Sequence, residues 1–342
     1  MASTPLTSII IWAGQSNLNN TAIGSFVSAI SMQSNAQMSY LKKHIVVAAL
    51  LASFALVPLS ASSFIEQSRN ISELNTGNIN ANKTYTLPPA PQSALNFDFK
   101  LKGYVFGLRM IRANYTGWFD QTNYNLYTDL KTSGLGALLK KLEIWAVTQG
   151  RYSSARLQPN WHIQQNLDKK NRRVEMNYNN LTQAVDVNIR PPLGSQGTPP
   201  ASPQERYAAH DTLSAILNFM MRGQKIDKPM CSGSVSVFDS KQHYNIRMVR
   251  DGMKSLKFNG EKSQTVRCLI YYEPISGFDP EDLPDPEEGS TPIKAYLKPF
   301  PELGLNIPIR FTYKISSIKA VIKLDELSVK LPNASQSETF SK

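Results

Sequence analysis

The side chains that could perform acid–base or nucleophilic chemistry are few in this sequence. Four histidines and two cysteines occur among 342 residues, and no G-x-S-x-G, H-E-x-x-H, G-x-x-x-x-G-K or C-x-x-C motif is present. A general base must reach the proton of its substrate, so the candidates past the N-terminal apolar segment are His162, His210 and His243. We expect His162 and His243 to be solvated on the polar faces of predicted strands. We expect His210 to hydrogen-bond locally to a turn, and we predict no catalytic residue.

Cys231 and Cys268 are the only two cysteines. In an exported protein an even count of two favours one disulfide between them. Cys268 shares the parity of Val266 and Ile270 in a predicted strand, so its sulfur is expected on the buried face. With so few cysteines and histidines, we predict no metal site and no cofactor.

Basic residues exceed acidic ones, 37 against 26, for a formal charge of +11. The densest cluster, in a predicted turn, consists of Lys169, Lys170, Arg172 and Arg173. One interpretation is a solvated turn, and the other is contact with an anionic surface of the cell envelope. A nucleic-acid partner is not expected for an exported protein. The oligomeric state is not indicated by the sequence.

The N-terminal segment has the layout of a secretory signal peptide. Two lysines precede the apolar run 45–56, and Pro58 and small residues follow it. A membrane-spanning helix needs about 20 apolar residues, so we expect cleavage after Ser62 and no anchoring. We interpret residues 1–37 as a disordered extension from an over-long start and 38–62 as the signal peptide. These features predict an exported protein, periplasmic in a Gram-negative bacterium.

The remaining chain is typical of antiparallel strands. After a polar and proline-rich lead-in at 63–92, residues 95–101 (LNFDFKL) alternate apolar and polar side chains, and about ten such segments occur in all. One apolar face and one charged face are the pattern of an antiparallel sheet that packs on one side. We predict an all-β fold over 93–330, a large curved antiparallel sheet or a β-barrel-like fold.

One short helix interrupts the strands. Asp211 is predicted to cap it, and Leu213, Ile216, Leu217 and Met220 follow at helical spacing, so an amphipathic helix is expected to plug or cover one end of the sheet. The proline-rich segments 191–205 and 279–292 are predicted loops. Residues 331–342 are predicted to be a disordered tail.

Several short motifs occur in the order found in a known family. They include Asp211-Thr212-Leu213-Ser214, Cys231-Ser232-Gly233, Val237-Phe238-Asp239, Cys268 and Ile307-Pro308-Ile309-Arg310. Over about 93–330 the chain resembles exported bacterial proteins grouped as domain of unknown function 3108. The resemblance implies an exported, periplasmic, all-β protein with a curved or barrel-like sheet. It also supports pairing of the two cysteines, and it implies no catalytic residue.

Three hypotheses of function follow. The first is a non-enzymatic periplasmic protein of the cell envelope that binds a lipid or other hydrophobic molecule inside its sheet, or that acts in envelope integrity, with peripheral contact to the membrane surface. The second is an envelope hydrolase in which a histidine and a carboxylate meet in a cleft. The third is an integral outer-membrane barrel with its apolar face toward lipid.

Overall fold

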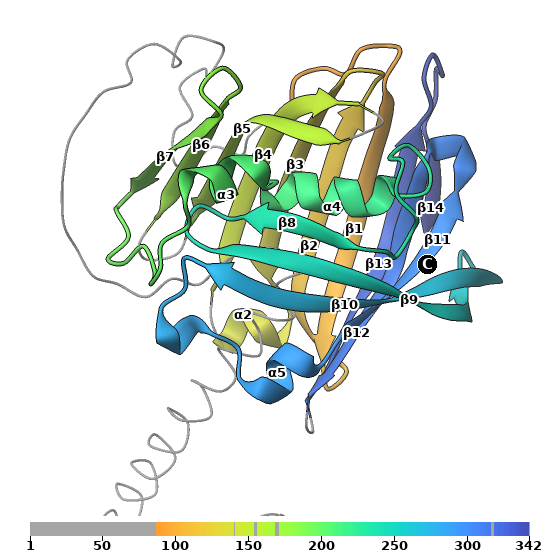
Figure 1. Ribbon diagram of the computed structural model, residues 1–342. Helices are drawn as coiled ribbons and strands as arrows, with labels where there is room; N and C mark the ends of the chain where they lie inside the picture. Colours follow the sequence, from red (N-terminus) through yellow and green to blue (C-terminus); the bar gives the residue numbers. More distant parts are fainter. Residues whose placement is uncertain (1–86, 140, 154–155, 168–170, 316–317, 342) are drawn as a thin grey trace, which may run out of the picture. The chain divides into compact units, whose positions relative to one another are not determined.

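A computed structural model describes residues 87–139, 141–153, 156–167, 171–315 and 318–341. These residues form one large antiparallel sheet with a few short helices (Figure 1). The predicted fold class, an all-β curved antiparallel sheet, is confirmed. The predicted extension, signal peptide and most of the lead-in lie outside the described residues.

The elements follow one another mostly as hairpins. The strands are β1 (Leu95–Val105), β2 (Leu108–Phe119), β3 (Asn123–Thr132), β4 (Glu143–Tyr152), β5 (Leu157–Asn166), β6 (Arg173–Asn179), β7 (Ala184–Arg190), β8 (Ser234–Phe238), β9 (His243–Phe258), β10 (Glu261–Ser276), β11 (Ile293–Phe300), β12 (Leu305–Ile315), β13 (Ile318–Lys330) and β14 (Glu338–Ser341). The helices are α2 (Leu135–Leu139), α3 (Pro203–Ala208), α4 (Thr212–Met221) and α5 (Pro286–Ser290), with the 3₁₀ turns η2 (Pro280–Asp282) and η3 (Pro301–Leu303).

The strand order across the sheet is β7-β6-β5-β4-β3-β2-β1-β13-β12-β11-β10-β9-β8, and β14 pairs with β13. Strands β1–β7 form one meander and β8–β13 a second. The antiparallel ladder between β1 and β13 joins the two meanders into a single sheet. This ladder links segments more than 200 residues apart in sequence, for example Phe97 with Val329.

The two end strands of this order, β7 and β8, approach the same helix. Helix α3 packs on both of them, and an apolar cluster draws on both ends of the sheet. Its buried members are Val174, Met176, Tyr178, Val185, Ala201, Ala209 and Phe238. The sheet therefore curves until its ends share one small core, which gives the fold its barrel-like form.

The described residues form fourteen strands where the sequence predicts about ten, and the alternation pattern does not single out β2, β3 or β4. Strand β3 shows the physical reason. Tyr124 and Leu126 face the main core, whereas Tyr127 on the other face packs in a second cluster with Trp145 and Val147. A strand buried on both faces loses the alternation of apolar and polar side chains.

Helix α4 lies across the concave face of the sheet (Figure 1). Asp211 caps it, as its sequence position predicts: one carboxylate oxygen accepts from the backbone amides of Leu213 and Ser214 at 2.9 and 3.1 Å. The sequence predicts that this helix plugs or covers one end of the sheet, and that predicted position is wrong. Nine of its ten residues are buried, because the sheet wraps around it and leaves Ile216 as the one partly exposed position.

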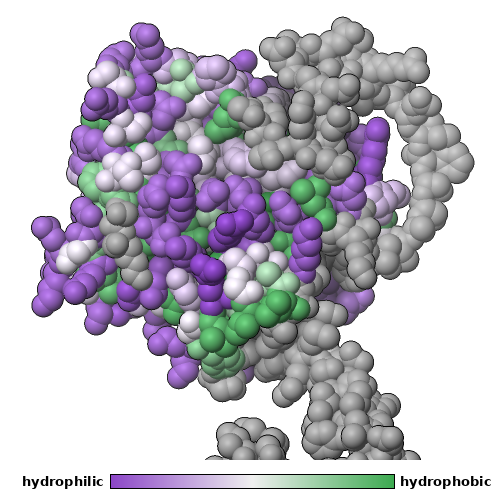
Figure 2. Space-filling model, turned by 180° about the vertical axis from the view of Figure 1, so that it is seen from behind, coloured by the Kyte–Doolittle hydropathy of each residue, from purple (hydrophilic) through white to green (hydrophobic). Residues whose placement is uncertain are grey.

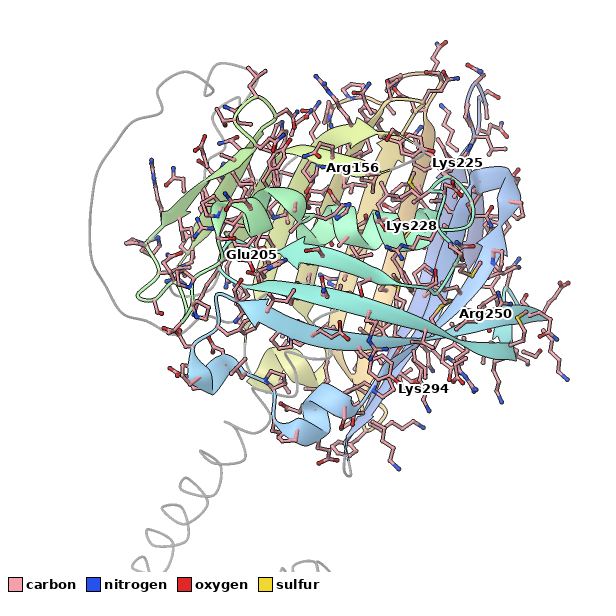
Figure 3. The ribbon with its side chains drawn as sticks, in the orientation of Figure 1. Arg156, Glu205, Lys225, Lys228, Arg250 and Lys294 are labelled. Carbon is pink, nitrogen blue, oxygen red and sulfur yellow. A yellow bond between two sulfur atoms is a disulfide. The ribbon has the colours of Figure 1, made fainter. Side chains whose placement is uncertain are left out.

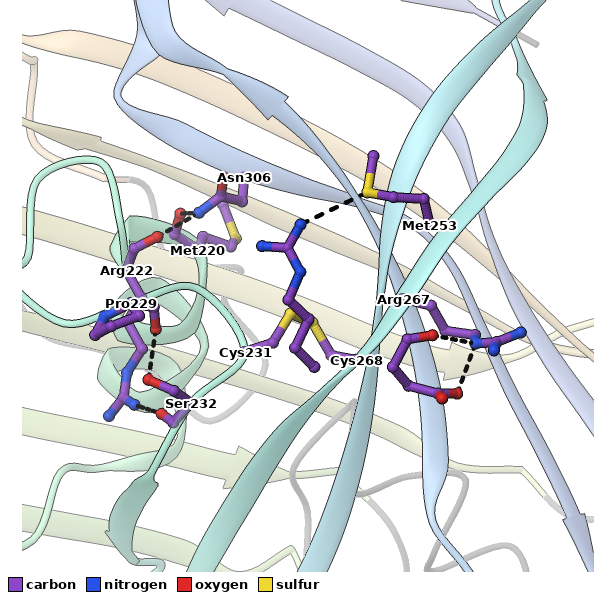
Figure 4. The surroundings of a disulfide bond; sticks show 11 residues. Met220, Arg222, Pro229, Cys231, Ser232, Met253, Arg267, Cys268 and Asn306 are labelled. Carbon is purple, nitrogen blue, oxygen red and sulfur yellow. Dashed lines mark hydrogen bonds and ion pairs between the residues drawn. A yellow bond between two sulfur atoms is a disulfide. The ribbon is translucent and has the colours of Figure 1, made fainter.

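The predicted disulfide is formed. Cys231 lies between α4 and β8, Cys268 lies in β10, and their Cα atoms are 5.4 Å apart (Figure 4). Cys268 is fully buried, on the face that its parity predicts. The guanidinium of Arg222, just after α4, donates to the carbonyl oxygens of Ser232 and Ser234. The connection from α4 to β8 is therefore held both covalently and by hydrogen bonds.

Three predicted irregular segments contain more structure than expected. The predicted loop 191–205 includes the first residues of α3. The tail 331–342 was expected to be disordered, but Glu338–Ser341 forms β14 on β13, which offers it free backbone groups at this position. The acidic segment 279–292 contains η2 and α5. Almost fully buried Lys241 anchors this segment, because its Nζ lies 2.5 Å from Asp279 and 3.2 Å from Asp282.

The disulfide closes a separation of 37 residues, so its removal enlarges the conformational freedom of the unfolded chain. We predict that replacing both Cys231 and Cys268 by Ala lowers the free energy of unfolding by ~2–4 kcal/mol. Urea denaturation measures this loss, and the unaltered chain under reducing conditions is the matched comparison. An unchanged unfolding midpoint in both experiments would contradict the prediction.

Candidate functional site: an apolar cavity beneath α4

A cavity of ≈ 80 Å³ lies between α4 and the curved sheet. Helix α4 contributes Leu213, Ala215, Ile216, Phe219 and Met220 to its wall. The remaining lining residues are Phe99, Leu101, Ala113, Tyr115 and Thr128 from β1–β3, and Val235, Ile246, Met248, Ile270, Tyr271, Tyr272, Ile293, Pro308 and Phe311 from β8–β12. Both meanders of the sheet therefore form the wall, together with the helix.

The lining offers a ligand little polar chemistry. The Tyr115 hydroxyl donates to the carbonyl oxygen of Leu213 at 2.9 Å, and the Thr128 hydroxyl donates to that of Asn114 at 2.6 Å. Burial raises the pKa of Tyr115 well above its usual value, with the charge of Asp211 acting in the same direction, so the phenol stays neutral. Such a surface favours hydrocarbon over a polar or charged ligand.

A buried polar network lies beside the cavity, at the start of α4. Asp211 accepts hydrogen bonds from the hydroxyls of Thr148 at 2.7 Å and Ser214 at 2.5 Å. His162 Nδ1 lies 3.2 Å from Asp211 Oδ1 and 2.7 Å from the Thr148 hydroxyl. The Ser214 hydroxyl also lies 2.8 Å from that of Tyr124. None of these residues lines the cavity.

The prediction that His162 is a solvated surface residue is wrong, since only 2% of it is exposed. Ile163 belongs to the second apolar cluster on the outer face of the sheet, and Trp161 and Leu167 pack against that cluster. His162 therefore points inward, where the Asp211 carboxylate and the Thr148 hydroxyl satisfy it. The apolar face of β5 therefore lies on the outer face of the sheet, and the polar His162 lies on the inner face.

The Asp211 carboxyl is ionised in spite of its burial. Burial alone raises its pKa, but the charge of His162 and the hydrogen bonds from His162, Ser214 and Thr148 outweigh this effect and leave the pKa below its usual value. The hydrolase hypothesis requires such a histidine–carboxylate contact in an open cleft. Here the contact is enclosed, and its geometry serves to cap α4 and to hold it against β4 and β5.

The other two histidines lie where α3 and α4 meet β8 and β9. The prediction of a solvated His243 is wrong: it is buried, with Nε2 2.7 Å from the Ser236 hydroxyl and Nδ1 3.5 Å from a carboxylate oxygen of Glu205. His210 was expected to hydrogen-bond to its own turn, but its backbone amide donates instead to the carbonyl oxygen of Ser236 on β8, 26 residues away, at 2.9 Å. Burial lowers the pKa of His210 to about 4.

The cation cluster predicted to contact an anionic surface is only partly described. Lys169 and Lys170 lie outside the described residues. Arg172 donates to the carbonyl oxygens of Pro191 and Pro192 at 3.1 and 3.4 Å. Arg173 lies 2.6 Å from Glu175, with its guanidinium over the ring of Trp145. Both arginines thus have partners within the protein, and an anionic contact at this turn stays a prediction.

The cavity could be anticipated only in part. Phe99 and Leu101 have the parity of a buried face, and Leu213 and Met220 lie on the apolar face of the predicted helix, so these residues were expected inside. No sequence pattern indicates that packing leaves space between them, because that depends on residues from nine elements. Among the described residues, no group of three or more His, Cys, Asp or Glu side chains could hold a metal ion. In the same part of the chain, no helix has the length and apolar character needed to cross a bilayer.

No family model matches the chain, and no curated protein does. A crystal structure of a β-barrel-like protein of domain of unknown function 1849 from Brucella abortus is 12% identical, with a TM-score of 0.38, and the match covers 70% of this chain and 98% of that one. A candidate lipoprotein from Parabacteroides distasonis is 13% identical, with a TM-score of 0.26, covering 68% and 94%.

The lowered pKa of His210 makes stability depend on pH. Its folded pKa of about 4 lies below the unfolded value of 6.5, so the unfolded chain binds more protons between these two pH values. The contribution of His210 to stability is therefore full above pH 6.5, and we predict that this contribution falls by up to ~3 kcal/mol as the pH falls to 4. The lowered pKa of His243 acts in the same direction, whereas that of Asp211 acts only at lower pH. Burial raises the pKa of Asp239 to about 6, which acts in the opposite direction to His210 between pH 6 and 4.

Urea denaturation at pH 7.5 and pH 4.5 measures this dependence. A His210→Gln variant, which cannot titrate, should lose less stability between the two pH values than the unaltered chain. Equal losses in the variant and the unaltered chain would contradict the assignment to His210.

Proposed function

We propose that this protein is a non-enzymatic, exported protein of the cell envelope whose curved sheet binds a lipid or other hydrophobic molecule in the cavity beneath α4. The observation that carries the proposal is the apolar lining of that cavity, whose hydroxyls on Tyr115 and Thr128 already donate to backbone carbonyls. Transfer of apolar surface from water to such a site is favourable by roughly 25 cal/mol per Å².

The cavity volume limits what fits without movement. A cavity of about 150 Å³ lined by apolar side chains accepts benzene, so the cavity of ≈ 80 Å³ accommodates an apolar group smaller than benzene. An acyl chain therefore requires the lining to rearrange. Met220 and Met248 belong to the lining, and methionine has three rotatable bonds and adapts to irregular spaces. We propose that these two side chains move to admit the ligand.

Export is supported by the sequence and by the disulfide. The predicted signal peptide at 38–62 directs the chain out of the cytoplasm, and a disulfide such as Cys231–Cys268 persists in an oxidising compartment. Membership of the family grouped as domain of unknown function 3108, and location in the periplasm of a Gram-negative bacterium, belong to the same proposal.

The two rival functions receive less support. An envelope hydrolase needs its histidine and carboxylate to reach a substrate, but His162 and Asp211 are both enclosed. A membrane-spanning barrel turns its apolar side chains outward to lipid. In this sheet the largest apolar cluster lies around α4 on the concave face, and residues such as Lys100 and Lys102 lie on the outer face.

Native mass spectrometry of the protein purified from the envelope of its host tests the proposal. We expect a population of higher mass that loses a hydrophobic molecule on solvent extraction. A single mass equal to that of the processed chain, under conditions that retain a bound lipid in a known carrier, would contradict it.

A substitution that fills the cavity should abolish binding. We predict that Ala215→Met, which extends a side chain from α4 into the space, weakens binding of a hydrophobic fluorescent probe at least tenfold, because the probe and the new side chain compete for one volume. Ala208→Met, at an exposed position of α3, is the matched control and should bind as the unaltered chain does. Equal affinity of both variants would show that the probe binds elsewhere.

A further inference from the structure

A row of cations crosses five adjacent strands on the outer face of the sheet. Its members are Arg310 on β12, Lys323 on β13, Lys102 on β1, Arg112 on β2 and Lys131 on β3, each in direct register with the next. Ala113 and Leu130, their neighbours in sequence, belong to the main core, so alternation places the cations on the opposite face. We call these five residues the cation row.

Carboxylates of the protein pair with some members of the cation row. Lys102 lies 2.8 Å from Asp325, and Lys131 lies 4.0 Å from both Asp129 and Glu143. Arg112, the fourth of the five residues in the row, is exposed and lies between Lys102 and Lys131 in register. Like charges directly opposite each other destabilise a strand pair. An anionic partner outside the protein would offset this repulsion.

More cations extend the row toward the turn between β1 and β2. Lys314 and Lys319 face each other in register across β12 and β13, and both are exposed, as is Arg109 on β2. The backbone amide of Phe106 donates to the carbonyl oxygen of Lys319 at 3.2 Å. The basic surface therefore reaches the tip of the β1–β2 hairpin.

Apolar side chains project from the same end of the sheet. Phe106 and Leu108 flank Gly107 at the β1–β2 turn and are 60% and 50% exposed, and Leu135 and Leu138 on α2 are 44% and 81% exposed. Helix α2 lies beside β2, because the amide of Ser133 donates to the carbonyl oxygen of Met110 on β2 at 2.9 Å. We call these four residues the tip patch.

The two features are adjacent on one face of the molecule. Figure 2 shows hydrophobic residues gathered along the lower edge of the face seen from behind, with hydrophilic residues directly above them. Exposed apolar side chains bordered by cations are the composition of a surface that lies on an anionic bilayer, where the apolar groups enter the headgroup region and the cations contact phosphates. A nucleic-acid partner would leave Phe106 and Leu138 without a role.

We propose that this face docks on a membrane surface containing anionic phospholipid, with the tip patch inserted among the headgroups and the cation row, Arg109, Lys314 and Lys319 above it. This docking does not depend on a ligand in the cavity. It orients the protein with its β1–β2 and β3–β4 turns toward the bilayer.

Sedimentation with phospholipid vesicles tests the proposal. The full chain should bind vesicles of 70% phosphatidylcholine and 30% phosphatidylglycerol at least tenfold more tightly than vesicles of pure phosphatidylcholine, and salt should weaken the binding. Near a membrane surface each cation contributes about fivefold in affinity. The variant R112Q/K314Q/K319Q should therefore bind the anionic vesicles about a hundredfold more weakly.

The matched control removes the same charge elsewhere. Arg156 lies in the β4–β5 turn, and Lys225 and Lys228 lie between α4 and β8, away from α2 (Figure 3). The variant R156Q/K225Q/K228Q should bind within about twofold of the unaltered chain, because these cations are not on the docking face. All variants share residues 1–86, so any contribution of that segment cancels in the comparison.

A second pair of variants tests the apolar part. F106S/L138S should weaken binding to anionic vesicles at least tenfold, whereas Leu181→Ser, at a residue 96% exposed in the β6–β7 turn, should leave it unchanged. Thermal unfolding must show that each variant is folded, which surface substitutions permit. The proposal is overturned by absent vesicle binding, by equal losses in the matched pairs, or by tighter, cation-dependent binding of a single-stranded oligonucleotide.

Discussion

The stability of the fold depends on burying the apolar concave face of one large sheet away from water. The main apolar cluster extends from Phe97 on β1 through Leu126 on β3 to Ile307 on β12, and a flat sheet would expose all of it. Curvature brings the two meanders toward each other, and α4 fills the space between them. Nine of the ten helix residues are buried, so the helix acts as the centre of the core and not as a lid on one end.

Both ends of α4 need polar partners, because the helix termini are buried along with its side chains. Asp211 satisfies amides at the start of the helix, and His162 and Thr148 hold Asp211 to the sheet. At the other end, the Asn306 side chain donates to the carbonyl oxygens of Met220 and Arg222 at 3.0 and 2.6 Å. His162 and Asp211 therefore fix the position of α4. A histidine beside a carboxylate is typical of a catalytic site, but here the pair has a structural role.

The position of α4 also determines the site. The helix leaves an apolar cavity on the side of β1–β3 and β8–β12, while its polar first turn rests against β4 and β5. The outer face bears a different chemistry, with cations in register across β12, β13 and β1–β3. A protein that binds an apolar molecule inside and an anionic lipid surface outside would place both activities on opposite faces of the same strands.

The fold class could be predicted from local patterns in the sequence, whereas the cavity and the surroundings of His162 could not. The sequence predicts the strand at Phe97 and Phe99 from the alternation of apolar and polar residues, and it predicts the helix cap at Asp211. Each of these patterns depends only on neighbours a few residues away. His162 was misplaced because Trp161 and Ile163 point to a second cluster, which becomes visible only when β4 and β5 are paired. The cation row was likewise hidden, because the register between β12, β13 and β1–β3 joins residues more than 200 positions apart.

Crystallography under xenon pressure can show whether the space beneath α4 is an apolar cavity, because xenon enters dry apolar cavities and avoids polar ones. We expect a xenon atom beneath α4, in contact with Phe99, Leu213 and Phe219, in a crystal whose sheet is otherwise unchanged. Ordered water in that space, or side chains that fill it completely, would show that the sheet and α4 do not enclose an apolar binding site.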